Sequence, residues 1–316
     1  MGLRLVAGGV VACTGPACED ARMTLQARLI AYPPDGAAVE RWIPAGGQLR
    51  IGRAPECAVL LDHPSISRSH AEIRDEAGAW RLRDLGSKNG SFIDGLRVAD
   101  AALARACWLR VGDVHCEFAL FDAAQAARAG AREQQRRTRS EVLIRDIAGR
   151  QRMDGLLDDV LRGVLELSGC TRGFLLLAEG PDYRVGASRS LDAGAMGART
   201  FSGSIGAVER ALAQRRPLAV NHVDSEPWLA GRASVLGLGL QSLVCVPLLD
   251  SDQCLGAVYA DRREAGEPIT QLDLELLGAF AESAAVYVLA GRAMAVLDGA
   301  PRWNTIVSNA RAGLRA

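Results

Sequence analysis

Three short clusters of glycine and polar residues, each set between strand-like runs, constrain the fold and function of this chain more than any other feature. They are Gly52-Arg53, Ser67-Arg68-Ser69-His70 and Ser87-Lys88-Asn89-Gly90. A phosphate is bound well by the planar donor fork of arginine together with a small hydroxyl or backbone N–H group. Arg53, Ser67 and Arg68 supply these groups, and the amide of Asn89 can pair with the backbone of an extended peptide. The clusters therefore predict a site for a phosphate and the peptide beside it.

The region around these clusters has the pattern of an all-β domain. Between Gln26 and Phe121, strand-like runs alternate with turns such as Pro33-Pro34-Asp35-Gly36. The runs Trp80–Asp84 and Val114–Leu120 alternate apolar and polar residues, so each is expected to bury one face. These observations predict a β-sandwich.

The three clusters in this order, followed by Leu109–Asp113, resemble the forkhead-associated (FHA) domain over residues 25–121. The resemblance implies an eleven-stranded β-sandwich whose loops at one end bind phosphothreonine in a partner protein, and hence a Ser/Thr kinase that modifies the partner. By motif position, the implied phosphate ligands are Arg53, Ser67 and Arg68, the clamp on the peptide backbone is Asn89, and the loop supports are Gly52, His70 and Gly90. Ser91 stands where many members have threonine, and we expect this departure to affect loop packing more than phosphate contact.

Length and composition indicate a folded protein with two domains. The 316 residues exceed one ordinary domain, and 49% of them are hydrophobic and 23% charged. Lysine and arginine together number 37, as do aspartate and glutamate, so the formal net charge is zero. A neutral chain is not steered as a whole to nucleic acid or to a membrane surface, and we expect neither as a direct partner.

The eight cysteines favour a reducing compartment. They form no Cys-x-x-Cys pair and have no histidine partners at metal-binding spacing. Several occupy apolar positions of strand-like runs, where a reduced thiol is a small core residue. We therefore expect a cytoplasmic protein without a bound metal, and we expect no segment that is long and apolar enough to cross a membrane.

The segments outside the sandwich differ in character. Residues 1–24 fit neither domain and are expected to be a disordered extension, whereas residues 122–152 are rich in Ala, Gln and Arg and are expected to form a helical linker. An apolar seam near heptad spacing continues from this linker, and its members are Leu143, Ile147, Leu157, Leu161 and Val164. Either the seam joins two chains in a coiled coil, or the helix packs on its own domain.

Residues 153–292 show strands before, between and after helices, which predicts an α+β domain with its helices on one side of the sheet. The expected helices are Leu156–Leu167, Ser204–Arg215 and Thr270–Arg292, and the expected strands are Arg172–Leu177, Tyr183–Arg189, Pro217–Val220, Ser242–Leu248 and Leu255–Asp261. Thr270 and Asp273 resemble a capping box. Residues 293–316 form a tail without the signature of an output module, so we expect a partner to supply the output.

The order of these elements, with Ser242–Leu248 and Leu255–Arg262 before a long helix, resembles the GAF domain. The resemblance implies small-molecule sensing and dimerisation through the flanking helices. The sequence has neither a Cys-His pair placed for a tetrapyrrole nor the motif of the cyclic-nucleotide-binding members. No cofactor is therefore predicted, and an unidentified small-molecule ligand stays open. The long segment Asn221–Leu240 predicts a lid over a pocket beside the sheet.

Three functions agree with this pattern. The leading one is a non-catalytic bacterial signalling adaptor that binds phosphothreonine-containing partners through the FHA-like domain and senses a small molecule or dimerises through the GAF-like domain. The second is a scaffold whose GAF-like domain holds no ligand. The third is a GAF-type, thiol-dependent methionine sulfoxide reductase that uses Cys245 and Cys254, but both lie in apolar strands and the Ala-Cys-Asp-Ser turn of that family is missing. We therefore predict a homodimer that is not an enzyme.

Overall fold

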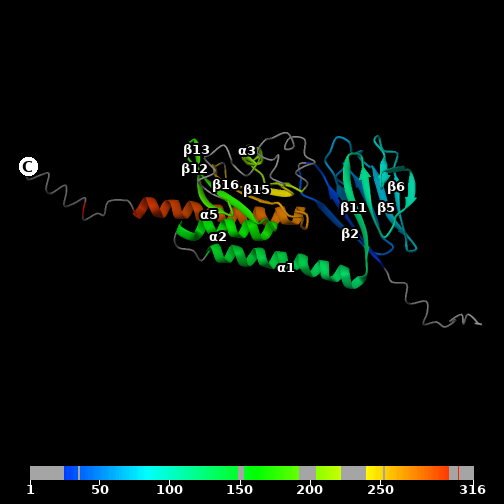
Figure 1. Ribbon diagram of the computed structural model, residues 1–316, viewed down its shortest axis with the longest axis horizontal. Helices are drawn as coiled ribbons and strands as arrows, with labels where there is room; N and C mark the ends of the chain where they lie inside the picture. The colour runs from blue at the N-terminus through cyan, green and yellow to red at the C-terminus, as the bar shows by residue number, and fades with distance from the viewer. Residues whose placement is uncertain are drawn as a thin grey trace, which may run out of the picture.

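The computed structural model of the protein describes residues 25–34, 36–148, 153–191, 204–221, 240–251, 253–298 and 305. It arranges them as an N-terminal β-sandwich, a long helix, and a C-terminal α+β domain (Figure 1). The predicted disordered extension over residues 1–24 and most of the predicted lid, residues 222–239, lie outside the described residues.

The N-terminal sandwich, residues 26–121, has eleven described strands in two sheets, as the sequence predicted. One sheet has the order β2-β1-β11-β10-β7-β8, and the other has the order β4-β3-β5-β6-β9. The strands are β1 Gln26–Tyr32, β2 Val39–Ile43, β3 Gln48–Gly52, β4 Val59–Leu60, β5 Ala71–Glu76, β6 Ala79–Asp84, β7 Ser91–Ile93, β8 Leu96–Val98, β9 Asp100–Ala102, β10 Ala106–Val111 and β11 Val114–Phe121.

The alternation seen in the sequence builds the core of this sandwich. On β11, Val114, Cys116 and Phe118 are fully buried, whereas His115 between them is exposed. Trp80 on β6 packs against Phe118, with 6.1 Å between the ring centroids. Because β6 and β11 belong to different sheets, this aromatic contact helps to hold the two sheets together.

The C-terminal α+β domain contains one antiparallel sheet with the order β13-β12-β16-β15-β14. Its strands are β12 Arg172–Glu179, β13 Asp182–Arg189, β14 Leu218–Val220, β15 Ser242–Asp250 and β16 Gln253–Arg262. Its helices are α2 Met153–Ser168, α3 Ile205–Gln214 and α5 Gln271–Asp298. All the helices and strands expected here are present, and α5 continues past its predicted end at Arg292 into the segment expected to be a tail.

The helices lie on both faces of this sheet, which corrects the prediction that they lie on one side. α2 and α5 cover one face, where Val164 and Phe280 pack in one core with Leu175 of β12. α3 covers the other face, where Ala207 packs in a second core with Tyr259 of β16. Both faces of the strands are apolar, so the sequence pattern carries no sign of which face a helix covers.

The start of α5 is capped as the sequence predicted. The Thr270 backbone N–H donates to Asp273 Oδ2 at 2.8 Å, and the Asp273 backbone N–H lies 3.3 Å from Thr270 Oγ1. α3 is capped in a similar way, because Ser204 Oγ accepts from the Ala207 backbone N–H at 3.2 Å. These side chains satisfy backbone donors that have no partner within the helix.

The helix α1, Ala123–Ala148, packs against the α+β domain of its own chain. Leu143 and Ile147 are buried in the same core as Leu161 and Val164 of α2. The apolar seam is therefore covered within one chain, which confirms the second interpretation of its pattern and not the coiled coil. Figure 1 shows α1 running beside α2 below the sheet.

Among the described residues, one backbone junction joins the two domains directly. The Ala38 backbone N–H donates to the Ile269 carbonyl at 2.9 Å, and the Gln271 backbone N–H donates to the Ala38 carbonyl at 2.9 Å. The Asn221 side chain bonds both backbone groups of Ile269, since its Nδ2 donates to the Ile269 carbonyl and its Oδ1 accepts from the Ile269 N–H. Ala37 is buried in the core of the α+β domain. The loop between β1 and β2 thus forms part of the C-terminal domain's packing.

The expectation about membrane-crossing segments was wrong. Between Gln271 and Met294, α5 is long and apolar enough to cross a membrane by length and composition, with a mean hydropathy of 1.4. One side of α5, which includes Phe280 and Val288, is buried in the core of the α+β domain. This packing explains why these positions are apolar. The other side leaves Val286 and Leu289 exposed. A helix that packs on a sheet can pass the same compositional test.

The burial of α1 predicts the effect of truncating its seam. Leu143→Ala should lower the free energy of unfolding by about 2–5 kcal/mol, because it removes buried methyl groups and leaves a cavity. The exposed Glu141→Ala on the same helix should change it by no more than about 0.5 kcal/mol. Chemical denaturation of the full chain measures both, and equal effects of the two substitutions would show that α1 is a detached linker.

Candidate functional site

The three polar clusters lie on neighbouring loops of the N-terminal sandwich. Arg53 follows β3, Ser67 and Arg68 lie between β4 and β5, and Asn89 lies between β6 and β7. One open cleft of 590 Å³ is lined by Arg53, Glu56, Ser67, Arg68 and Ser69. Both arginines are exposed, so their guanidinium groups are accessible to a ligand. The structure thus brings the three predicted phosphate ligands to one cleft, with Asn89 on the adjacent loop.

Gly52 allows the first two loops to touch. A Cβ atom at this position would lie 2.2 Å from the Arg68 carbonyl oxygen and 2.7 Å from Cys57 Sγ, so no larger residue fits without displacing backbone. The close approach lets the Arg53 backbone N–H donate to the Ser67 carbonyl, and the Ala54 N–H donate to the Arg68 carbonyl, each at 3.0 Å. These bonds fix the spacing of the two arginines.

His70 supports the same loops from the interior. Its side chain is fully buried, its Nδ1 accepts from the Ser67 backbone N–H at 3.1 Å, and its Nε2 donates to the Gly90 carbonyl at 3.1 Å. Because one ring nitrogen accepts and the other donates, the ring is held as the neutral Nε2–H tautomer. Burial lowers the pKa of His70 below its ordinary value of 6.5, despite the nearby Gly90 carbonyl and Asp84.

Asp84 organises the third loop, although the sequence analysis gave it no role. Its Oδ1 accepts from the backbone N–H groups of Gly86 and Ser87, and its Oδ2 accepts from the hydroxyls of Ser87 and Ser91, each at 2.7 Å. Burial alone would raise the pKa of Asp84, but these hydrogen bonds outweigh burial and lower it. Ser91 is fully buried and contacts Asp84, in keeping with the expectation that it affects loop packing. The sequence does carry a signal for the role of Asp84: an aspartate followed closely by Gly86 and Ser87 is typical of a turn that a side chain stabilises.

Further bonds tie the third loop to the second. Asn89 Nδ2 donates to the Ser65 carbonyl at 2.8 Å, and the Lys88 backbone N–H donates to Ser67 Oγ at 3.1 Å. Gly90 adopts a positive φ of 81°, a conformation that glycine reaches at low cost. Ser65, a second residue that the sequence analysis missed, also accepts from the Asp113 N–H through its hydroxyl. The three loops therefore form one hydrogen-bonded surface.

Comparison with known families assigns both domains. Residues 49–118 match the FHA domain family, and residues 152–288 match the GAF domain family. The chain contains an FHA domain followed by a GAF domain. The N-terminal sandwich is the FHA domain, the C-terminal α+β domain is the GAF domain, and both resemblances seen in the sequence are confirmed.

Individual relatives match mainly the FHA domain. The glycogen accumulation regulator GarA of Mycolicibacterium smegmatis is 36% identical over 67 residues, which cover 21% of this chain and 42% of GarA. The oxoglutarate dehydrogenase inhibitor of Corynebacterium diphtheriae is 36% identical over 72 residues, which cover 20% of this chain and 50% of that protein. The chain thus spans half or less of the length of these relatives. A GAF domain of a phosphoenolpyruvate-protein phosphotransferase from Coxiella burnetii is 12% identical, with a TM-score of 0.44, and covers 52% of this chain and 98% of that one.

The cysteines considered for a reductase do not form an activated pair. Cys245 is fully buried on β15, and burial, together with the nearby Cys254, raises the pKa of its thiol. Cys254 lies on β16 and its Sγ donates to the Gly256 carbonyl at 3.4 Å. A thiol with a raised pKa is a poor nucleophile, because the thiolate is the reactive form. Both matched families are regulatory or binding domains.

The buried neutral ring of His70 predicts a pH dependence of stability. Its pKa is lowered on folding, so the unfolded chain binds a proton more readily than the folded chain. The contribution of His70 to the free energy of unfolding is therefore present above about pH 6.5, and it is lost as the pH falls through that value towards the pKa of the folded state. Chemical denaturation over this pH range should show that the free energy of unfolding falls less for His70→Gln than for the wild type. The exposed His115→Gln should keep the wild-type dependence, and three parallel profiles would refute the assignment.

Proposed function

We propose that the protein is a signalling adaptor whose FHA domain binds phosphothreonine-containing partners. The convergence of Arg53, Ser67 and Arg68 on one open cleft carries the proposal. A phosphoryl group adds about −1.5 to −2 charges and strong acceptor oxygens, and arginine forks match such a group. Ser67 Oγ already accepts from the Lys88 N–H, which leaves its hydroxyl proton to donate to a phosphate oxygen.

Asn89 fits the role of a clamp on the peptide backbone. Its Nδ2 is held by the Ser65 carbonyl, so the side-chain oxygen has a fixed orientation as an acceptor for a peptide N–H. Gly52, His70 and Gly90 act indirectly, since they set the loop shapes that position the arginines. The proposal implies a Ser/Thr kinase that modifies the partner, and a cytoplasmic location where ATP is available to it. The names of the two relatives, a regulator and an inhibitor, agree with a protein that acts on other proteins.

For the GAF domain we propose small-molecule sensing, with a ligand-free scaffold as the alternative. The α3 face of its sheet carries a closely packed core, in which Phe174 stacks on Tyr259 with 4.9 Å between ring centroids. Tyr259 also accepts from the Ser204 backbone N–H through its hydroxyl. This packing favours the scaffold for the described part of that face, so a ligand is better sought elsewhere on the domain.

Phosphopeptide binding gives the principal prediction. A phosphothreonine peptide should bind, its unphosphorylated form should not, and phosphoserine should bind more weakly. Arg53→Ala should weaken binding by at least about tenfold, or about 1.4 kcal/mol, because it removes a charge-assisted contact. Arg53→Lys should not restore it fully, since an ammonium lacks the planar fork. Asn89→Ala should weaken binding while the phosphate contacts persist.

A titration of a degenerate phosphopeptide library against these variants makes the measurement. Arg83→Ala is the matched control, because Arg83 is exposed on β6 and lies outside the loops. It should bind like the wild type. Equal binding of phosphorylated and plain peptides, or wild-type affinity in Arg53→Ala, would remove the basis for the function.

We also propose a homodimer, now through α5 and no longer through the buried seam. α5 exposes Val286, Leu289 and Met294, and the exposed fraction of Val286 is 60%. An apolar stripe on a helix surface gains stability when a second copy covers it. Light scattering should give a dimer for the full chain and a monomer for Val286→Glu combined with Leu289→Glu. Leu96→Glu, a change of an exposed apolar residue in the FHA domain, should remain dimeric; a wild-type monomer would contradict the proposal.

A further inference from the structure

Arg262, the last residue of β16, is a buried cation without a carboxylate partner among the described residues. Only 7% of the residue is exposed. The described hydrogen bonds of its side chain both come from Nη2, to Ser242 Oγ at 3.3 Å and to the Glu267 carbonyl. Its Nε is buried and has no hydrogen-bond partner in the described part of the chain. This arrangement leaves a positive charge and at least one donor uncompensated.

Arg172 shows how the same domain treats a comparable charge. It is also 7% exposed, but it forms an ion pair with Asp261, whose Oδ2 accepts from Arg172 Nη2 at 3.1 Å. Burying an ion without a counter-charge is costly, so buried charges are normally paired. Asp261 pairs with Arg172, so the next residue, Arg262, has no carboxylate partner in the described part of the chain.

Arg262 lines a cleft of 520 Å³ between α1, the end of α2 and the loop that leads into α5. This volume lies within the range of small-molecule sites. The cleft is lined by four arginines and three carboxylates, so its lining has an excess of one positive charge. The other arginines are paired: Arg132 with Glu267 at 3.2 Å, Arg136 with Glu267 and Asp273, and Arg139 with Glu166 at 2.5 Å. The unbalanced charge belongs to Arg262.

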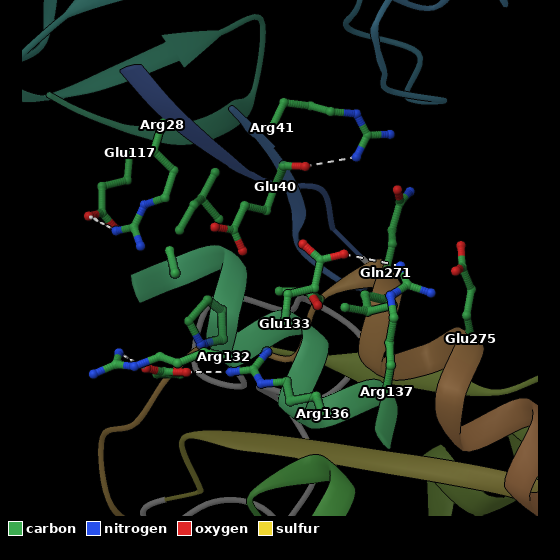
Figure 2. Close-up of a pocket in the computed structure, with 16 residues that line it drawn as sticks. Arg28, Glu40, Arg41, Glu117, Arg132, Glu133, Arg136, Arg137, Gln271 and Glu275 are labelled. Atoms are coloured by element: carbon green, nitrogen blue, oxygen red, sulfur yellow. Dashed lines mark hydrogen bonds and ion pairs between the residues drawn. The ribbon is translucent and has the colours of Figure 1, made fainter. Parts of the chain in front are cut away.

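An adjacent cleft of 450 Å³ between the FHA domain and α1 lacks this imbalance (Figure 2). It is lined by as many glutamates as arginines. Figure 2 shows Arg28 beside Glu117 on the FHA side, where the two are joined by an ion pair of 3.4 Å. Charge balance therefore separates the two clefts and selects the one at Arg262 as the site for an anion.

Two glycines lie close against the Arg262 guanidinium. A Cβ atom at Gly266 would lie 2.8 Å from Nη1 and 3.0 Å from Cζ, and one at Gly169 would lie 3.4 Å from Nη1. Gly169 has a positive φ of 64°, which by itself favours glycine, but Gly266 has no such backbone reason. A side chain at Gly266 would therefore crowd the guanidinium, and the arginine would have to shift to make room for it.

We propose that this cleft binds the oxyanion group, a phosphate or a carboxylate, of a small molecule. The Arg262 guanidinium is the primary donor, and Arg132 and Arg136 on α1 also line the cleft. The site lies on the side of the GAF sheet that α2 and α5 cover, away from the packed core under α3. It is independent of phosphothreonine binding by the FHA domain.

Inorganic phosphate and succinate are the probes, each compared with sodium chloride at equal ionic strength. All measurements use the full chain with Arg53→Ala, which removes one of the three proposed phosphate ligands of the FHA domain and so weakens phosphate binding there. Calorimetric titration and thermal unfolding should show saturable binding and a rise in Tm with at least one probe. The stronger probe identifies the chemistry of the natural group. No saturable binding of either probe would overturn the proposal.

Substitutions then assign the binding to Arg262. Arg262→Gln should abolish it, whereas Arg263→Gln, which removes the neighbouring exposed arginine, should leave it unchanged. Because Arg262 also bonds the Glu267 carbonyl, its loss can impair folding, and Gly266→Ala provides an independent test. Gly266 is exposed, and the added methyl group should weaken binding by about tenfold, which is about 1.4 kcal/mol, with the charge retained. Wild-type binding in a folded Arg262→Gln or in Gly266→Ala would overturn the assignment.

Discussion

The arrangement of the two domains depends on the hydrogen bonds of the Ile269 backbone. Its carbonyl accepts from the Ala38 backbone N–H of the FHA domain and from Asn221 Nδ2, while its own N–H donates to Asn221 Oδ1. Three segments that are distant in the sequence meet there: the β1–β2 loop, the end of β14 and the start of α5. A buried backbone group costs stability when it is unpaired, so these bonds fix the contact geometry. The FHA domain thus contacts the GAF domain directly at Ile269, and the helix α1 connects the two domains a second time.

Three buried side chains, those of His70, Arg172 and Arg262, differ in how the protein offsets the cost of burying a charge. His70 avoids the cost by staying neutral and using both ring nitrogens in hydrogen bonds. Arg172 offsets it with the carboxylate of Asp261. Arg262 has neither solution within the described chain, and the cleft in front of it provides room for an external anion. Ligand sites are commonly places where the protein alone leaves a buried charge without a counter-charge.

The sequence predicted the elements well where side-chain periodicity or turn chemistry was local. The capping pair of Thr270 and Asp273 and the alternation on β11 depend on residues a few positions apart, and both are present as expected. The residues that shape the FHA loops were only partly predictable. The hydrogen-bond partners of the Asp84 carboxylate lie within 7 residues of it, so its turn pattern could have pointed to its role. Ser65 instead accepts from Asp113, which lies 48 residues away, and a serine in a turn looks the same in sequence whether or not it joins other loops.

By itself the sequence determined the two domain types and the set of candidate phosphate ligands, because each motif is a short run whose chemistry does not depend on distant residues. The tertiary structure decided which surfaces are covered. It buried the seam at Leu143 and Ile147 inside one chain, placed α3 on the opposite face of the GAF sheet, and left Arg262 without a counter-charge among the described residues. Coverage and charge pairing are set by residues far apart in the chain, so they exist only once the chain has folded.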